Sequence, residues 1–289
     1  MHTILVPIDF SEAAYSAFQY GVHLANLVYA RLKLIHVTPV PVTESYGIAP
    51  SPTTTYKETL AEKTRLMDEW ERKIPIQLRR NIEILPQVVF GNVEEELIKH
   101  MKSSPPSLLV MGTKKRSMLS NFLFGGIIRE LLPDLTCPLL IVPCGTKYKT
   151  INHISFGTNF QDQDHLVVER LMDFPFLTEA TIHCVHVGNG GSAAKEDFSN
   201  GLEKLKEKFN RDVMFHTLAV EEPNKKMVVQ ELLSFSQEHK IQMMALLAHS
   251  RGFWGKLFQD SVVNKMQQDA SIPLLVFNVE QKERFASFP

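Results

Sequence analysis

The sequence predicts an α/β protein made of two tandem, doubly wound, five-stranded, mostly parallel sheets with flanking helices. Three observations carry this prediction: short sequences recur at a fixed offset, apolar strand-like runs alternate with helical segments, and each repeat closes with one more apolar run. At 289 residues the chain is long enough for two domains of ordinary size. We expect a first repeat at residues 1–145, a degenerate second repeat at 150–289, and the linker Gly145–Lys149 between them.

Internal repetition is the strongest of these signals. Two anchors recur 150 residues later, namely Ile8-Asp9-Phe10 as Thr158-Asn159-Phe160, and Ile35-His36-Val37 as Val185-His186-Val187. The closing runs begin at Cys137 and Ile272 and are only 135 residues apart, so the second repeat lacks about 15 residues. The long polar segment Pro41–Tyr56 of the first repeat is the part expected to be missing.

The first repeat contains five runs with strand character. They are expected at Thr3–Ile8, Leu32–Val37, Ile82–Val89, Leu108–Met111 and Leu139–Val142. Continuous apolar character, as in the opening run, is typical of parallel strands that are buried on both faces. Four helices are expected between them, from Ser11 onward and at Lys57–Arg72, Val93–Met101 and Gly126–Leu132. Ser11 is a good N-cap, and the apolar residues that follow it are spaced as on one helix face.

The second repeat follows the same order. Its strands are expected near His153–Phe156, Thr181–Val187, Val213–Val220, Met243–Leu247 and Leu274–Phe277. Strands that alternate with helices indicate βαβ crossovers and therefore a parallel sheet. We expect two superposable sheets rather than one continuous sheet, packed about a pseudo-twofold axis as an intramolecular pseudo-dimer. The last strand of each repeat is apolar and suits edge pairing, which leaves a homodimer open as well.

Composition excludes several classes of function. The formal net charge is −1, which gives no electrostatic case for DNA or RNA as a partner. No window approaches the roughly 20 apolar residues of a membrane helix, and the N-terminus has no signal-peptide pattern. Three cysteines are an odd number and too few for a disulfide framework. We therefore expect a soluble, cytoplasmic protein with no membrane partner.

Residues that could bind a ligand follow the strands. In an open parallel sheet, ligands bind beyond the carboxyl ends of the strands where the strand order reverses. The segment Pro7–Ser11 follows the first strand, and Met111–Arg116 follows the fourth. Further on, Gly125-Gly126 opens a helix. Glycines at a strand end and at a helix start let backbone amides approach a phosphate group.

These segments resemble the universal stress protein family, whose fold is of the adenine nucleotide α-hydrolase-like type. The family pattern Val-Pro-x-Asp-x-Ser is matched by Val6, Pro7, Asp9 and Ser11; Met-Gly-Thr by Met111, Gly112 and Thr113; the Cys-Pro and Val-Pro of the last strand by Cys137, Pro138, Val142 and Pro143; and the glycine before the third helix by Gly91. The resemblance covers the whole chain in two copies. It implies a stress-response binding protein and not an enzyme.

The resemblance also implies where a nucleotide would bind. ATP-binding members carry glycine, two residues, glycine, nine residues, glycine, then Ser or Thr. Here Gly112 and Gly125 fit, whereas Lys115 replaces the middle glycine and Gly126 replaces the hydroxyl residue. We expect ATP or another adenine nucleotide to bind weakly and in the first repeat only, with Asp9 accepting from the ribose. The expected binding residues are Pro7, Asp9, Val37, Gly112, Lys115, Arg116, Gly125 and Gly126.

The second repeat departs further from the pattern. Asn159 replaces the carboxylate, Ala248 stands at the first glycine position, Arg251 at the second and Asp260 at the third, while Ser261 alone fits. An acidic group at a phosphate-binding helix start repels the phosphate. We expect this repeat to have lost nucleotide binding.

Each feature also has a purely structural interpretation. Asp9 can serve as a turn or cap residue, Gly112 and Gly125 as packing or turn residues, and Lys114–Arg116 as a solvated loop. His183, Cys184 and His186 look like a metal cluster, but strand alternation places His183 on the face opposite Cys184 and His186. Since structural zinc normally needs four ligands, we expect no metal site.

Three functional hypotheses remain open. The leading one is a tandem, non-enzymatic stress-response protein with an adenine nucleotide in the first repeat. The second is a nucleotide-free scaffold for protein–protein contacts, with partners that the sequence does not identify. The third is a nucleotidyl-transfer or adenylating enzyme, whose usual loop motifs are absent from the sequence, as are a nucleophile elbow and a P-loop. We therefore expect no catalytic residues.

Overall fold

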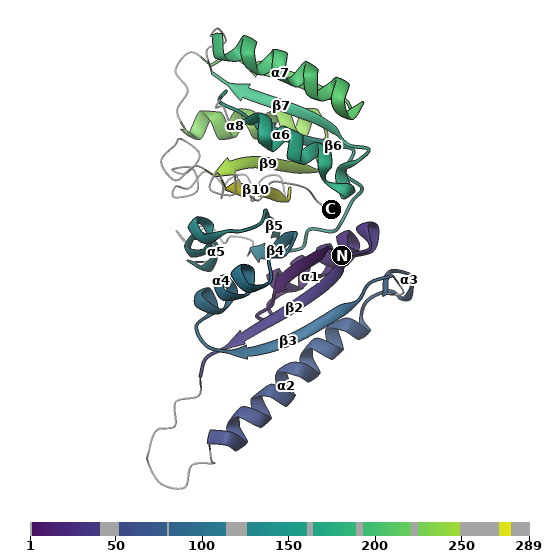
Figure 1. The fold of residues 1–289 in the computed structure, drawn as a ribbon, viewed down its shortest axis with the longest axis vertical. Helices are drawn as coiled ribbons and strands as arrows, with labels where there is room; N and C mark the ends of the chain where they lie inside the picture. Colours follow the sequence, from purple (N-terminus) through teal and green to yellow (C-terminus); the bar gives the residue numbers. More distant parts are fainter. Residues whose placement is uncertain are drawn as a thin grey trace.

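The structure is a computed structural model that describes residues 2–40, 52–79, 81–113, 126–160, 164–188, 193–220, 225–248 and 272–278. Figure 1 shows an elongated molecule in which the strands follow one another along the long axis and helices flank them. The first repeat forms the lower part of this view and the second repeat the upper part.

The first repeat contains the five expected strands. They are β1 (Thr3–Pro7), β2 (Arg31–Thr38), β3 (Ile84–Phe90), β4 (Leu108–Thr113) and β5 (Leu139–Pro143). Its helices are α1 (Glu12–Val28), α2 (Pro52–Arg72), α3 (Ile76–Arg79), α4 (Val93–Ser103) and α5 (Gly126–Leu131), with the 3₁₀ turn η1 (Leu132–Asp134). Helix α2 begins at Pro52, ahead of the start predicted at Lys57, and α3 is not among the predicted helices.

The second repeat has the same order of elements. Its strands are β6 (His153–Gly157), β7 (Thr181–Val187), β8 (Val213–Leu218), β9 (Met243–Ala248) and β10 (Leu274–Asn278). The described helical segments are α6 (Asp164–Asp173), the 3₁₀ turn η2 (Pro175–Leu177), α7 (Ala193–Phe209) and α8 (Lys225–Glu238). All five predicted strands are therefore confirmed, and only the end of β8 differs by more than one residue.

The described strands form one sheet of ten, in the order β3-β2-β1-β4-β5-β10-β9-β6-β7-β8. Within each repeat every pairing is parallel. The strand order reverses between β1 and β4 in the first repeat and between β6 and β9 in the second. These are the two topological switch points at which a ligand site of this fold is expected.

The expectation of two separate sheets is wrong. Strand β10 pairs with β5 antiparallel, with Leu275 opposite Leu140, and this pairing joins the five-stranded halves into one continuous sheet. Both strands are buried along their whole length. An apolar edge strand exposes unpaired backbone groups, and pairing the two edges satisfies these groups and removes the apolar surface from water. The halves therefore form an intramolecular pseudo-dimer.

Helices cover both faces of the sheet, as the doubly wound prediction requires. One apolar core lies under α1, α2, α6 and α7, and the other lies under α4, α5 and α8. Each core contains residues of both repeats, for example Phe18 and Phe156 in the first core and Leu139 and Val276 in the second. The two repeats consequently share their apolar interior across the β5–β10 pairing.

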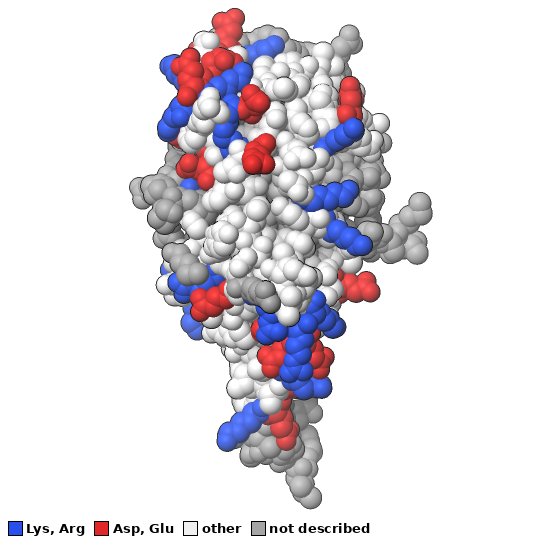
Figure 2. Space-filling view, turned by 90° about the vertical axis from the view of Figure 1, so that its right-hand side faces the viewer, with Lys and Arg blue, Asp and Glu red and all other residues white. Residues whose placement is uncertain are grey.

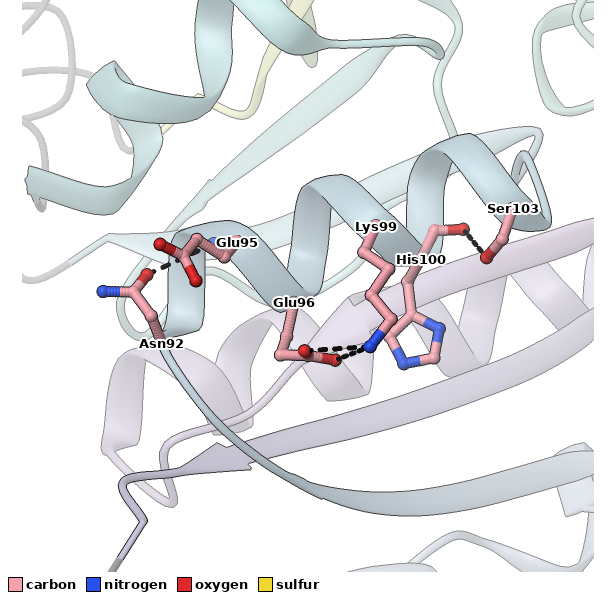
Figure 3. A network of polar contacts seen from close by, with 6 residues as sticks. All are labelled: Asn92, Glu95, Glu96, Lys99, His100 and Ser103. Atoms are coloured by element: carbon pink, nitrogen blue, oxygen red, sulfur yellow. Dashed lines mark hydrogen bonds and ion pairs between the residues drawn. The ribbon is translucent and has the colours of Figure 1, made fainter.

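Helix α4 shows how local sequence sets a helix start (Figure 3). The Asn92 side chain accepts a hydrogen bond from the Glu95 amide at 3.2 Å, which satisfies one of the unpaired donors of the first turn. Three glutamates occupy that turn, and their negative charges interact favourably with the positive end of the helix dipole. Lys99 then donates to Glu96 at 3.1 Å, a favourable pair one turn apart.

The linker between the repeats is anchored on α1. The Gly145 amide donates to Ser16 Oγ at 2.9 Å. The Tyr148 ring stacks on His23 with the ring centroids 4.9 Å apart and meets Tyr20 edge-on at 5.3 Å. Burial raises the pKa of the Tyr148 hydroxyl. The connection is thus packed against the first repeat.

Two surface properties are also evident. Figure 2 shows Lys and Arg side chains lying among Asp and Glu side chains near both ends of the molecule, and few charges in the middle of this face. In the described ranges, no helix combines the length and apolar character that crossing a membrane requires.

Candidate functional site

The loop after β1 is built around Asp9. Its Oδ1 accepts a hydrogen bond from the Ser11 amide at 3.0 Å, and Ser11 Oγ in turn accepts from the Ala14 amide at 3.2 Å. Ser11 is therefore the N-cap of α1, as predicted. Asp9 is a turn residue by geometry, yet its side chain is exposed to solvent. The Asp9 carboxylate can therefore hold the turn and still be reached by a ligand.

The residue after Asp9 adopts an unusual backbone conformation. Phe10 has a φ of 61°, in the left-handed region that non-glycine residues rarely occupy. The His36 Nδ1–H donates to the Ile8 carbonyl at 2.7 Å, and the Phe10 ring lies 4.7 Å from the His36 ring. Burial lowers the pKa of His36, although its hydrogen bond to Ile8 acts in the opposite direction. A neutral His36 thus holds the loop in place.

The same arrangement of a Phe with positive φ and a His that holds the loop recurs in the second repeat. Phe160 has a φ of 63°, and its ring stacks on His186 at 4.2 Å. The His186 Nδ1–H donates to the Thr158 carbonyl at 3.0 Å. The repeated Phe and His anchors of the sequence therefore share one structural role. That role could have been inferred from their pairing at a common offset, but only the structure shows the contact.

Helix α2 closes one side of the first-repeat loop. Trp70 is buried and meets Phe10 at 5.6 Å and Tyr15 at 5.1 Å, in both cases edge-on. Lys63 Nζ lies 5.8 Å from the centre of the Phe10 ring, a geometry that allows a cation–π contact. Sequence reasoning gave neither Trp70 nor Lys63 a part in this region, because α2 is separated from β1 by about 40 residues of chain.

The switch point brings four of the predicted site residues to the ends of neighbouring strands. Pro7 pairs with Ile35, so Asp9 and Val37 both lie two residues beyond this pair on adjacent strands. On the other side, β4 pairs with β1 and ends with Gly112 and Thr113. Pro7, Asp9, Val37 and Gly112 thus occupy one region at the carboxyl edge of the sheet.

Gly112 is needed there for packing. A Cβ atom at this position would lie 2.0 Å from the Ala13 carbonyl oxygen and 2.9 Å from the Ala14 nitrogen, both backbone atoms of α1. The strand end and the first turn of α1 can approach this closely only if residue 112 has no side chain. The close contact is therefore with the chain's own helix.

The remaining predicted residues are divided between two regions. Lys115, Arg116 and Gly125 lie outside the described residues. Gly126 is the first residue of α5, and of the residues that the structure describes an added Cβ there would meet the Glu130 side chain, at 3.7 Å. Of the second-repeat positions, Arg251, Asp260 and Ser261 also lie outside the described part of the chain.

The second repeat closes its switch point with an internal carboxylate. Asp164 is 1% exposed; its Oδ2 accepts from the Thr158 hydroxyl at 2.6 Å and from the Asn159 amide at 3.2 Å. The position equivalent to Asp164 in the first repeat is Ala14, so a negative charge replaces a methyl group beneath the loop. Nothing in the sequence pattern marked Asp164, because its partners come from the preceding loop.

The strand ends of the two repeats differ as well. At the Gly112 position the second repeat carries Ala248, the last residue of β9. The two repeats therefore share a topology but not a strand-end surface: the first presents a carboxylate to solvent and the second buries one.

These features define a class of protein, the tandem doubly wound α/β proteins with a polar loop at the switch point. Comparison with known proteins identifies the family. The pattern that defines the universal stress protein family matches residues 1–143. Universal stress protein YxiE of Bacillus subtilis (strain 168) is 26% identical over 146 residues, which are 48% of this chain and 97% of that protein.

Solved structures extend the likeness to the whole chain. A universal stress protein from Archaeoglobus fulgidus DSM 4304 aligns with a TM-score of 0.71 at 14% identity, covering 96% of this chain and 98% of that one. A putative universal stress protein from Pseudomonas aeruginosa UCBPP-PA14 aligns with a TM-score of 0.57 at 12% identity, covering 99% and 98%. The chain belongs to the universal stress protein family and is of the tandem type.

Proposed function

We propose that this protein is a cytoplasmic, non-enzymatic stress-response protein that binds an adenine nucleotide, with ATP as the first candidate, in the first repeat only. The observation that carries the proposal is the contrast between the two switch points. Asp9 presents its carboxylate to solvent at the end of β1, whereas Asp164 is buried under the equivalent loop. A charged acceptor in water can receive a ligand hydroxyl, whereas a buried carboxylate that already accepts two hydrogen bonds from its own loop is closed off from a ligand.

The residues around Asp9 fit a nucleotide in part. In this proposal the Asp9 carboxylate accepts from the ribose, and the backbone of Pro7 and Val37 borders the base. Gly126 and the segment before it, with Lys115, Arg116 and Gly125, are the candidates for phosphate contacts. In this proposal the nucleotide binds reversibly, and the protein acts through that binding without catalysing a reaction.

The second candidate function is a nucleotide-free scaffold for protein–protein contacts. The packing of Gly112 favours it, because the missing side chain is used to admit the backbone of α1 and not a ligand. Lys115 also replaces a glycine of the nucleotide-binding pattern. Direct measurement of binding separates the two functions.

Calorimetry with ATP on the purified protein tests the proposal. A hydrogen bond to a charged acceptor contributes roughly 1.5–3 kcal/mol, so Asp9→Ala is expected to weaken binding by about 10- to 150-fold. The matched substitution Asn159→Ala in the second repeat should leave binding unchanged. A stoichiometry of one nucleotide per chain is expected.

Two outcomes contradict the proposal. If the wild-type protein shows no measurable heat at millimolar ATP, the scaffold function takes its place. If Asp9→Ala and Asn159→Ala weaken binding equally, the first repeat is not the site. A third variant, Lys115→Gly, reports on that side chain: tighter binding identifies Lys115 as an obstruction, and weaker binding identifies it as a cation for phosphate.

A further inference from the structure

Four histidines gather on the face of the second repeat that α8 covers. His153 begins β6, His183 lies in β7, His216 lies in β8, and His239 directly follows α8. His153 Nδ1 lies 3.1 Å from His183 Nε2, and His183 Nδ1 lies 3.1 Å from His216 Nε2. The His239 ring is 5.3 Å from the His216 ring and 5.7 Å from that of His183. No sequence pattern indicates this cluster, because its four residues come from three separate strands and one helix end.

The hydrogen-bond geometry limits how many protons the cluster can hold. A neutral His183 has one N–H, so it donates to one neighbour and accepts from the other. A single added proton on His183 is accommodated, because both of its nitrogens then donate to neutral His153 and His216. A further proton on either neighbour would place two N–H groups 3.1 Å apart. The three hydrogen-bonded rings of His153, His183 and His216 therefore hold one extra proton without breaking a nitrogen–nitrogen contact.

The surroundings oppose protonation further. Phe235 of α8 stacks on His239 at 3.9 Å and lies 4.7 Å from the His216 ring, and its carbonyl accepts from His239 Nδ1 at 3.1 Å. His183 is 4% exposed. Burial first, and then the charges of His216, His153 and His239, lower its pKa to about 4.

Among the described residues, the only charged groups that affect the pKa of His183 are other histidines. They are His153 on β6, His216 on β8 and His239 at the end of α8. Burial, with a smaller effect of His239, also lowers the pKa of His216. Glu238 precedes His239 but is exposed. No described carboxylate compensates a positive charge here.

The arrangement is a chain and not a metal site. His183 directs one nitrogen toward His153 and the other toward His216, so the nitrogens do not converge on one point. Across the described ranges, no three His, Cys, Asp or Glu side chains are placed to hold a metal ion. The contacts between ring nitrogens are instead suited to binding protons.

We propose that the cluster of His153, His183, His216 and His239 is a proton-binding switch through which mild acid releases α8 and β8 from the second repeat. The folded chain of imidazoles accommodates one added proton, at His183, and burial opposes even that one, so the open form binds protons more readily. A second proton forces apart either the β6–β7 or the β7–β8 imidazole pair, and β8 is the outermost of the described strands, paired with β7 alone among them. Helix α8 packs over the same rings, so it loses its contact surface at the same step.

The direction of the pH dependence follows from the lowered pKa values. In the unfolded chain a histidine titrates near pH 6.5. His183 and His216 remain neutral below that pH in the folded state, so the stability that their neutral forms contribute is complete above about pH 6.5. It is lost as the pH falls from there toward 4. Each proton bound in excess by the open state shifts the opening equilibrium tenfold per pH unit.

Hydrogen–deuterium exchange of the full chain, analysed by peptide and corrected for the intrinsic pH dependence of exchange, tests the proposal. Between pH 7.5 and pH 5.0, the protection of the α8 and β8 peptides is expected to fall by at least about tenfold. The peptides of α1 and β1 should keep theirs. EDTA should not change the result.

Two variants remove members of the chain. His183→Leu replaces the central ring with an apolar side chain, and His216→Gln keeps a polar group on β8. Each should move the loss of α8 protection to lower pH by about one unit, and either variant suffices if the other does not fold. The control is His100→Gln on α4 (Figure 3), a histidine of the first repeat that should leave the transition of α8 in place.

Four results overturn the proposal. They are equal protection of wild-type α8 and β8 at both pH values, an unchanged transition in His183→Leu or His216→Gln, an equal shift in the His100→Gln control, and abolition of the acid response by EDTA. The last result would assign the cluster to a metal.

Discussion

Substituting Gly112 with alanine separates the two interpretations of this residue. The added Cβ would lie 2.0 Å from the Ala13 oxygen and 2.3 Å from the Ala13 carbonyl carbon. Ordinary van der Waals contact begins near 3.4 Å, so the first turn of α1 must move by more than about 1 Å. The opposing atoms belong to the backbone, and no side-chain rotation can relieve the overlap.

The size of the effect follows from what α1 holds in place. The helix is 17 residues long, and ten of them are buried, among them Phe18, Tyr20 and Leu24. Overpacking in a well-packed core costs roughly 1–3 kcal/mol, and the backbone overlap places Gly112→Ala at the upper end of that range. For a domain of 150–250 residues this corresponds to a Tm lower by about 6–12 °C.

Differential scanning calorimetry measures this change, with Gly126→Ala as the matched control. Among the described residues, the new Cβ at Gly126 meets the Glu130 side chain alone, so the Tm should stay within about 2 °C of wild type. If Gly112→Ala melts with the wild type and loses only ATP binding, then Gly112 is a ligand residue and the packing argument fails.

The remaining predictions concern stability. Arg211 donates to the carbonyl oxygens of Met172 at 2.6 Å and Ala180 at 2.9 Å, so Arg211→Met should destabilise the protein by about 2–4 kcal/mol in denaturant titration. Lys208→Met, which removes an exposed ion pair with Glu169, should leave the denaturation midpoint unchanged, and an effect equal to that of Arg211→Met would contradict the argument. After proteolytic cleavage within residues 146–149 the halves should remain associated on gel filtration; separation without denaturant would show that the β5–β10 pairing is too weak to join them.

Much of the architecture could be predicted because its causes are local. The alternation of strand and helix follows from apolar periodicity, and the start of α1 follows from Ser11 as an N-cap. The placement of His183 opposite Cys184 follows from strand alternation, and it is confirmed: Cys184 lies in one apolar core, while the next residue, Val185, lies in the other. These inferences need only neighbouring residues.

The candidate site could be predicted only in part. Pro7, Asp9, Val37 and Gly112 were correctly expected at strand ends, because parallel strands place their carboxyl ends at one edge. The packing of Gly112 against α1 could be weighed but not decided, since it depends on the distance between two elements. The burial of Asp164 could not be foreseen, because burial is a property of the surrounding structure and not of the residue type.

By itself the sequence determined the duplication, the order of the elements and the polar loops at the strand ends. Short-range patterns set all three, and they persist whatever the rest of the chain does. Only the tertiary structure decided that Leu275 lies opposite Leu140 in one continuous sheet, and that Asp9 faces solvent while Asp164 does not. These outcomes depend on which distant segments become neighbours, and burying apolar edges and satisfying buried polar groups are properties of the whole fold.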